Sequence, residues 1–201
     1  MPSSDTETVE VAADPAREAL LAQLVEGLGD AVLEHHLDPG HDLVVRVAPD
    51  AWATAAEYLH THCRYRFFDW LSAIDWMPSP FGRSLDSEVD KLLGLAEAAE
   101  EAAAAEMQHG VAGGSTRFQM LARVYSLNDL LGITLKADVP DDTLSVPTWT
   151  KTYPGANWHE REASEMFGIG FDGHPGLRNL YLPLEFEGHP SAKTSHCWPA
   201  L

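Results

Sequence analysis

Residues 154–175 read PGANWHEREASEMFGIGFDGHP and form the strongest local pattern in the chain. Asn157 belongs to the residue types that cap helix N-termini, and Glu160 three positions later completes the spacing of a capping box. Gly168 suits the left-handed backbone conformation that commonly ends a helix. The pattern therefore predicts a helix over 158–167, about three turns long.

This predicted helix carries an unusual mixture of side chains on one face. The residues that share the face at helical spacing are Trp158, Glu162, Glu165 and Met166. Arg161 borders the face, one turn before Glu165, at the spacing of a helical ion pair. An exposed helix does not usually place Trp and Met among its acids, and a buried helix does not usually keep Glu and Arg. The mixture predicts a helix half-buried against a partner that supplies its own charges.

Four chemical roles compete for this helix. Glu162 and Glu165 would serve as an acid–base pair in an enzyme, and His159 with Glu162, at positions i and i+3, would begin a metal site. The chain holds no His-Glu-x-x-His motif and no second Glu-x-x-His element, which argues against both roles. The other two roles are a structural ion-pair cluster around Arg161 and a docking helix, and these residues leave both open.

Two similar turns follow the helix. Phe171-Asp-Gly-His-Pro returns as Phe186-Glu-Gly-His-Pro. In each turn Gly permits a positive φ angle and Pro fixes the direction in which the chain leaves. His174 and His189 would bind a metal only with further donors, because two His residues alone are a weak signal. Structural turns are the favoured interpretation.

The composition excludes several classes of function. The 201 residues include 13 Lys and Arg against 31 Asp and Glu, a net charge of −18. A nucleic-acid-binding protein needs a basic surface, and an anionic membrane would repel this chain. Cys63 and Cys197 are too few for a disulfide framework or a four-thiolate metal site. Without a signal-peptide pattern or a run of roughly 18 apolar residues, we expect a soluble, cytoplasmic protein, at most peripheral to a membrane.

The rest of the chain alternates helical and strand patterns. Residues 1–14 are polar and acidic and predict a disordered tail. Apolar residues at helical spacing predict an amphipathic helix over about 15–36. A second helix is predicted to open at Pro49 and to place on one face Trp52, Ala55, Ala56 and Leu59. Strands are predicted at 43–47, 67–76, 118–127 and 132–139, and the last two form a hairpin. Residues 144–153 are expected to be extended.

Residues 78–115 interrupt this alternation. An Ala/Glu-rich, helix-prone stretch lies there between Gly/Pro-rich flanks, and it predicts an inserted helical arm, either a solvated surface helix or an interaction arm. The predicted fold class is α+β, with an N-terminal helix, a mostly antiparallel sheet with packed helices, and a Gly/Pro-rich C-terminal extension. We expect one domain over 15–190 that contains the insertion, followed by an atypical tail over 191–201.

The motif over 160–175 resembles the signature of the 30-kDa (C-type) subunit of respiratory complex I, the NADH–quinone oxidoreductase. That signature is Glu-Arg-Glu, a variable pair, an acidic residue, an apolar residue and an aromatic, then Gly and later Gly-His-Pro. The resemblance extends to the approach PGANW and to Leu182-Pro183 before the second Gly-His-Pro. Upstream it includes LSAIDW, FQMLARVYSL and ITLKADVPDDTLSVPT. After Pro190 the family's usual Leu-Arg-Lys-Asp is absent, and the chain ends SAKTSHCWPAL.

The resemblance implies an α+β fold and a non-catalytic structural subunit in the peripheral arm of a proton-translocating NADH–quinone oxidoreductase. Such a subunit docks on the D-type (49-kDa) subunit near the quinone site and supports electron transfer from NADH to quinone. It binds no cofactor or metal itself, and NADH, FMN, iron–sulfur clusters and quinone belong to the whole complex. The implied location is the cytoplasmic side of the cell membrane, as a peripheral membrane protein. The residues expected to contact partners are Trp158, Glu160, Arg161, Glu162, Glu165, Phe167, Gly168, Gly173, His174 and Pro175.

Two other functions compete with this expectation. One is the equivalent small subunit of a related membrane-bound hydrogenase or another donor–quinone reductase. The other is a free-standing metal-dependent enzyme, whose ligands would be His159, Glu162, His174 and His189.

Overall fold

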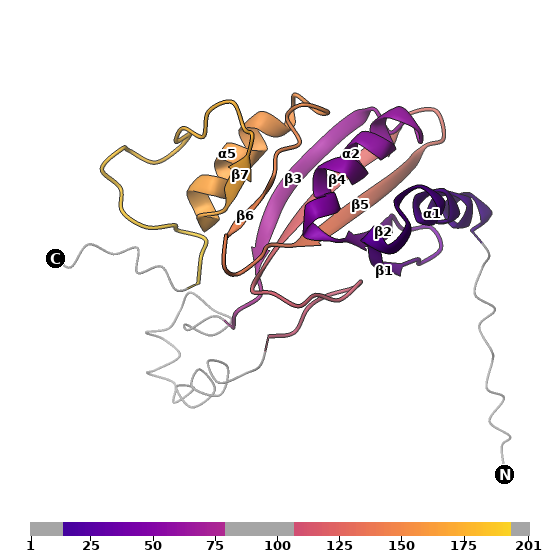
Figure 1. The fold of residues 1–201 in the computed structure, drawn as a ribbon, viewed down its shortest axis with the longest axis horizontal. Coiled ribbons are helices and arrows are strands. Elements are labelled where there is room, and N and C mark those ends of the chain that lie inside the picture. The colour runs from indigo at the N-terminus through magenta and orange to yellow at the C-terminus, as the bar shows by residue number, and fades with distance from the viewer. Residues whose placement is uncertain (1–13, 79–106, 194–201) are drawn as a thin grey trace, which may run out of the picture.

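A computed structural model of the chain describes residues 14–78 and 107–193 (Figure 1). Its elements are α1 (Pro15–Leu28), η1 (Gly29–Ala31), β1 (Val32–His36), β2 (Leu43–Val47), η2 (Pro49–Ala51), α2 (Trp52–Thr61), β3 (Phe67–Asp75), β4 (Phe118–Ser126), β5 (Leu131–Asp138), β6 (Ser145–Pro147), α5 (Ala156–Phe167) and β7 (Gly170–Asp172). The predicted N-terminal tail up to residue 13, most of the predicted insertion (79–106) and the end of the tail (194–201) lie outside the described residues.

A five-stranded sheet in the order β1-β2-β5-β4-β3 organises the fold. β2 and β5 pair in parallel, and the other neighbouring strands of this sheet pair antiparallel. β6 and β7 form a separate short parallel pair. Together with the helices this confirms the predicted α+β class with a mostly antiparallel sheet.

One face of the sheet is apolar and packs against α1 and α2. Alternate residues of β2 point into this core, namely Leu43, Val45 and Val47, as the period of a half-buried strand requires. The four predicted core residues of the second helix are all buried. Its Trp52 ring lies 4.5 Å from the Trp149 ring, and Trp149 Nε1 donates to the Trp52 carbonyl at 3.0 Å. This contact joins the core to the segment that leads into α5.

The first helix is shorter than predicted. α1 ends at Leu28, and Gly29 takes a positive φ of 55° that a continuing helix does not allow. Val32 instead begins β1 and pairs with Val47 of β2. The prediction of one helix over 15–36 was wrong because the apolar spacing of residues 32 and 33 also fits an edge strand, and Val favours strands.

The strands predicted at 43–47, 67–76, 118–127 and 132–139 are confirmed within one or two residues at each end. The predicted hairpin is the antiparallel pair β4–β5. The segment predicted to be extended over 144–153 forms only the three-residue strand β6, and a series of turns follows it. These turns bring the chain round to the start of α5.

The late helix, α5, lies along the edge strand β3 (Figure 1). His159 Nδ1 lies 3.4 Å from the Leu71 nitrogen and 3.1 Å from the Leu71 oxygen, so the helix covers part of the open edge of β3. The helix begins at Ala156, with Gly155 before it and no side-chain cap. The predicted capping box of Asn157 and Glu160 was therefore wrong, because Asn157 lies inside the helix. Gly168 has a φ of 81°, as the predicted helix end requires.

Candidate partner-docking site

Glu160 anchors α5 from inside the protein. Its side chain is 0% exposed. Its carboxylate accepts hydrogen bonds from Thr148 Oγ1 at 2.5 Å and from the Trp149 backbone N–H at 2.6 Å. Burial raises the pKa of Glu160 to about 7, although the hydrogen bonds from Thr148 and Trp149 act in the opposite direction. Glu160 thus ties α5 to the turn after β6, and it does not reach the surface in this fold.

His174 lies beside this buried carboxyl group. Its ring is fully buried, and Nε2 is 4.0 Å from Glu160 Oε2. Nδ1 accepts the Gly176 backbone N–H at 2.9 Å, so the neutral ring carries its proton on Nε2, which lies 3.3 Å from the Asn157 carbonyl. Gly173 before it has a φ of 83°. The first Gly-His-Pro turn is therefore fixed to the start of α5 by a histidine inside the fold.

Glu165 and Arg161 hold the segment that follows this turn. We call residues 176–188 the strap, the yellow loop beside α5 in Figure 1. The buried Glu165 carboxylate accepts three strap N–H groups at distances between 2.6 and 3.2 Å, from Leu180, Tyr181 and Leu182. Arg161 donates from Nε to the Arg178 carbonyl at 2.8 Å and from Nη2 to the Asn179 carbonyl at 3.1 Å. We call these five contacts with the strap backbone the strap latch.

The strap latch replaces the ion pair predicted between Arg161 and Glu165. Among the described residues, Arg161 forms no salt bridge, and both side chains bond the strap instead. Burial acts to raise the pKa of Glu165, but the strap N–H groups and the nearby Arg161 charge outweigh it and hold this pKa below its usual range. Glu165 is therefore a charged residue that organises an irregular segment.

The strap latch uses only backbone groups of the strap, so the strap side chains are left outside. Leu184 is 88% exposed, and Tyr181 and Leu177 are also exposed. On α5 itself Trp158 is 70% exposed. Large apolar side chains held in the open on an ordered segment are typical of a protein–protein contact.

The remaining predicted site residues shape this region. Phe167 packs edge-on against Phe118 of β4, with ring centroids 6.3 Å apart. Gly168 lies against the His189 ring, and a Cβ atom there would be 2.7 Å from His189 Cδ2. Glu162 is half-buried and Pro175 is exposed. Whether these side chains contact a partner stays a prediction.

The four side chains of the metal hypothesis are not brought together. His159 faces Leu71 of β3, His174 lies beside Glu160, and His189 Nδ1 is 2.9 Å from the Glu165 carbonyl oxygen. Within 14–78 and 107–193, no three His, Cys, Asp or Glu side chains are grouped so that they could hold a metal ion. The alternative of an acid–base pair, which the sequence already argued against, would use Glu162 and Glu165, but the strap N–H groups occupy the Glu165 carboxylate.

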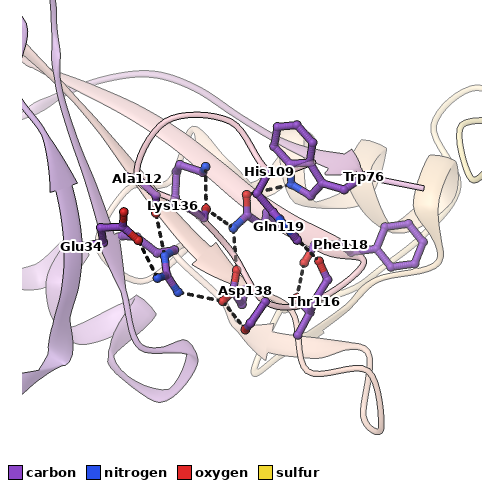
Figure 2. A network of polar contacts seen from close by, with 12 residues as sticks. Glu34, Trp76, His109, Ala112, Thr116, Phe118, Gln119, Lys136 and Asp138 are labelled. Atoms are coloured by element: carbon purple, nitrogen blue, oxygen red, sulfur yellow. Dashed lines mark hydrogen bonds and ion pairs between the residues drawn. The ribbon is translucent and has the colours of Figure 1, made fainter. Parts of the chain in front are cut away.

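A second polar cluster lies on the face of the sheet that points away from α1 and α2 (Figure 2). The sequence did not predict this cluster. It holds residues 107–116, which we call the clasp. Lys136 Nζ donates to the carbonyls of Val111 and Gly113 at 2.8 and 3.1 Å, and Arg46 Nε donates to the Ala112 carbonyl at 2.7 Å. Lys136 is buried; this burial, with the nearby Arg46 charge, lowers its pKa.

Asp138 connects Arg46 with polar residues of the sheet and of the clasp. It accepts from Gln119 Nε2 at 2.6 Å, from Ser115 Oγ at 2.8 Å and from Arg46 Nη1 at 3.0 Å. Burial acts to raise the pKa of Asp138, but the bonds from Gln119 and Ser115 and the Arg46 charge hold it below its usual range. All of these contacts are internal to the chain, so they fix the clasp to the sheet.

Sequence reasoning missed Thr148 and Trp149 as partners of Glu160, and it missed both the strap latch and the clasp. These contacts join residues 11 to 66 positions apart through irregular segments, and helical or strand spacing carries no signal for them. In the parts of the chain that the structure describes, none of the helices is both long and apolar enough to cross a membrane.

A family model and individual relatives of known name both match this chain, and they point to the same family. Residues 45–197 match the family described as respiratory-chain NADH dehydrogenase, 30 Kd subunit. A protein from Roseiflexus castenholzii, named as the C subunit of NADH-quinone oxidoreductase, is 31% identical over 176 residues, which cover 87% of this chain and 80% of the relative.

Longer relatives, named as the combined C/D subunit of NADH-quinone oxidoreductase, match over shorter segments. The Psychrobacter protein is 37% identical over 134 residues, which are 66% of this chain and 20% of the relative. The Klebsiella pneumoniae protein is 46% identical over 76 residues, which are 38% of this chain and 13% of the relative. This chain therefore spans a small part of the length of these relatives.

Two solved structures share the fold. A trypsin-resistant fragment of Nqo5 aligns with a TM-score of 0.51 at 21% identity, covering 80% of this chain and 98% of the fragment. A chain of an archaeal membrane-bound sulfane sulfur reductase aligns with a TM-score of 0.51 at 16% identity, covering 85% of this chain and 77% of that chain.

Proposed function

Because this chain belongs to the family of the 30-kDa subunit of respiratory-chain NADH dehydrogenase, we propose that it is a structural, non-catalytic subunit of an NADH–quinone oxidoreductase. It sits in the peripheral arm of a proton-translocating complex and docks on the D-type (49-kDa) subunit near the quinone site. NADH, FMN, iron–sulfur clusters and quinone are bound elsewhere in that complex. The assembled subunit lies on the cytoplasmic side of the cell membrane without spanning it.

The observation that carries the proposal is the way α5 presents the strap. Glu160 fixes the helix from inside, and Glu165 with Arg161 fixes the strap through backbone atoms alone. The apolar side chains of Trp158 and Leu184 are thereby held in the open on an ordered surface. Ordering a surface before binding reduces the entropy that is lost on association. This arrangement suits stable docking on another subunit.

The names of the longer relatives support the choice of partner. In the Psychrobacter and Klebsiella pneumoniae proteins one chain is named for both the C and the D subunits. A covalent link between two modules raises their effective concentration and requires that they can lie close together. We therefore place the D-type subunit beside this chain.

Assembly is tested first in native membranes. Membranes are solubilised gently, large complexes are separated, and the position of this chain is compared with NADH–quinone reductase activity and with the D-type subunit. Co-migration of all three is the expected result. Migration as a small species, or with a hydrogenase-type activity, would contradict the proposal.

The docking surface is tested by Trp158→Ala in the full chain, with affinity for the purified D-type subunit as the measurement. We expect affinity to fall by roughly 30-fold or more, as truncation of a buried aromatic anchor does. Val25→Ala is the matched control, because Val25 is 48% exposed on α1, beside the other edge of the sheet. Equal affinities for the two variants would show that α5 is not the docking surface.

A further inference from the structure

We infer that a pocket between α5 and the strap receives an acidic side chain of the partner subunit, gripped between Arg161 and Arg178. The inference rests on the proposed function and names the contact that fixes the docked position. The pocket has a volume of about 210 Å³, and its walls include Arg161, Ser164, Leu177, Arg178, Phe186 and His189. Small-molecule sites usually measure about 300–1,000 Å³, so this pocket suits one inserted side chain.

The charges of the pocket favour an anion. Glu165 also lines it, but three strap N–H groups and the Arg161 charge already stabilise its carboxylate. Two arginines therefore line the space, against one carboxylate that is already engaged. In a chain with a net charge of −18, this is a local positive site.

Both arginines have donors to offer. The Arg178 side chain is exposed and makes no hydrogen bond or ion pair with the residues that the structure describes. Arg161 bonds the strap through Nε and Nη2, which leaves further N–H groups among the five that a guanidinium carries. A carboxylate between the two arginines would accept paired N–H bonds from planar groups, the geometry in which arginine binds carboxylates best.

An apolar occupant would bury the Arg178 guanidinium and the remaining Arg161 N–H groups without a partner, which costs free energy. An acidic side chain would neutralise them. The exposed apolar residues beside the pocket, Leu177 and Tyr181, would then exclude water from the charged contact. Because the negative chain as a whole repels anions at long range, the contact would set register and lifetime more than the rate of encounter.

The main test is Arg178→Glu in the full chain, with affinity for the D-type subunit measured at a fixed salt concentration. Because this side chain bonds none of the described residues, the fold is expected to persist, and circular dichroism checks it. We expect affinity to fall at least 30-fold, with a smaller loss for Arg178→Lys. Lys151→Glu is the matched control, an exposed cation that does not line the pocket, and it should change affinity less than twofold.

A charge exchange identifies the occupant. Single Asp→Arg and Glu→Arg substitutions in the D-type subunit are combined with Arg178→Glu. One of them should raise the affinity at least tenfold above that of Arg178→Glu with the unchanged subunit. If Arg178→Glu stays within twofold while Trp158→Ala weakens binding, the pocket inference is wrong and the docking proposal stands. If neither variant weakens binding, the docking proposal itself fails. If no partner acid gives rescue and inorganic phosphate binds the isolated chain through Arg178, the occupant is a free anion and the inference is overturned.

Discussion

The strap and the clasp are both irregular segments held by side chains that bond their backbones, yet they differ in where the holding groups lie. The clasp is held by Arg46 and Lys136, on the inner strands β2 and β5 of the sheet, and these cations bond its successive carbonyls. The strap is held from α5, beside the edge strand β3, where the buried carboxylate of Glu165 bonds three successive N–H groups. The strap carries exposed apolar side chains outward, and the clasp covers polar groups of the sheet.

A charged side chain that bonds the backbone of an irregular segment can therefore serve two purposes. A charge that is buried with its partners becomes an uncompensated buried charge when a partner is removed, and this strongly destabilises the fold. Among the described residues the Glu165 carboxylate bonds only the strap backbone, so its removal frees only the segment that it held. The clasp should therefore matter for folding, and the strap for presenting a surface.

The largest expected effect is at Asp138. Asp138→Ala would remove the carboxylate that Arg46 and Gln119 bond and whose charge acts on Lys136. We expect a loss of about 3–5 kcal/mol in the free energy of unfolding, the range found when a buried ion pair loses one member. Urea unfolding measures it.

Asp69→Ala is the matched control for this prediction. Asp69 pairs with Arg123, but its side chain is 35% exposed. Surface pairs contribute roughly 0–1 kcal/mol, so the control should lose no more than that. If Asp138→Ala and Asp69→Ala lost the same free energy of unfolding, the Asp138 contacts would matter no more for folding than a surface ion pair.

A pH effect of similar size is expected at Glu160, beneath the docking region. Its pKa is raised by burial from an ordinary value of 4.5 to about 7. Between these values the folded protein holds a proton that the unfolded chain has released, so stability falls as pH rises from about 4.5 to 7. At 1.36 kcal/mol per pKa unit the loss is about 3 kcal/mol at most.

Glu160→Gln should remove this fall, because Gln is similar in shape and does not ionise. Asp138 and Glu165 act in the opposite direction, since their lowered pKa values give stability above the ordinary carboxyl pKa that is lost as pH falls. Denaturant unfolding at pH 5 and pH 7.5 compares the proteins. If the free energy of unfolding changed by the same amount between pH 5 and pH 7.5 in the unchanged chain and in Glu160→Gln, Glu160 would not be the cause.

A smaller and local effect is expected at Glu165. Glu165→Ala removes the acceptor of the Leu180, Tyr181 and Leu182 N–H groups. The strap should open with about 1–3 kcal/mol less free energy, and hydrogen exchange of these amides should accelerate by tenfold or more while core amides keep their rates. Glu162→Ala on the same helix should leave all of these rates unchanged. Acceleration of the core amides as well would mean that the strap unfolds together with the sheet.

The sequence predicts the strands and the end of α5 better than the contacts that hold the irregular segments. The strands and the helix end at Gly168 were predicted because period-two patterns and a left-handed glycine are local signals. The end of α1 was mispredicted, because Val32 fits both a helical face and an edge strand. The motif around Glu160 was located, but its capping role was wrong, since the carboxylate turns inward to Thr148.

The strap latch and the clasp were not predicted at all. Glu165 bonds N–H groups 15 to 17 residues away, and Lys136 bonds a carbonyl 25 residues away. Both targets are backbone atoms in irregular segments, and every residue type carries these atoms. Only the path of the chain, which packing decides, brings them to the charged side chains.

The smallest expected effect on stability is at the most exposed residue of the strap. Leu184 is 88% exposed, so Leu184→Ser should change the free energy of unfolding by less than about 0.5 kcal/mol. If the strap presents a docking surface, the same change should weaken association with the D-type subunit by roughly tenfold, about 1.4 kcal/mol. Val111→Ser makes the matched change on the clasp, where Val111 is 51% exposed while Lys136 holds its carbonyl. Because the clasp is assigned to folding and its backbone bonds are kept, this variant should keep both stability and affinity. Loss of affinity in Val111→Ser but not in Leu184→Ser would reverse the roles of the two segments.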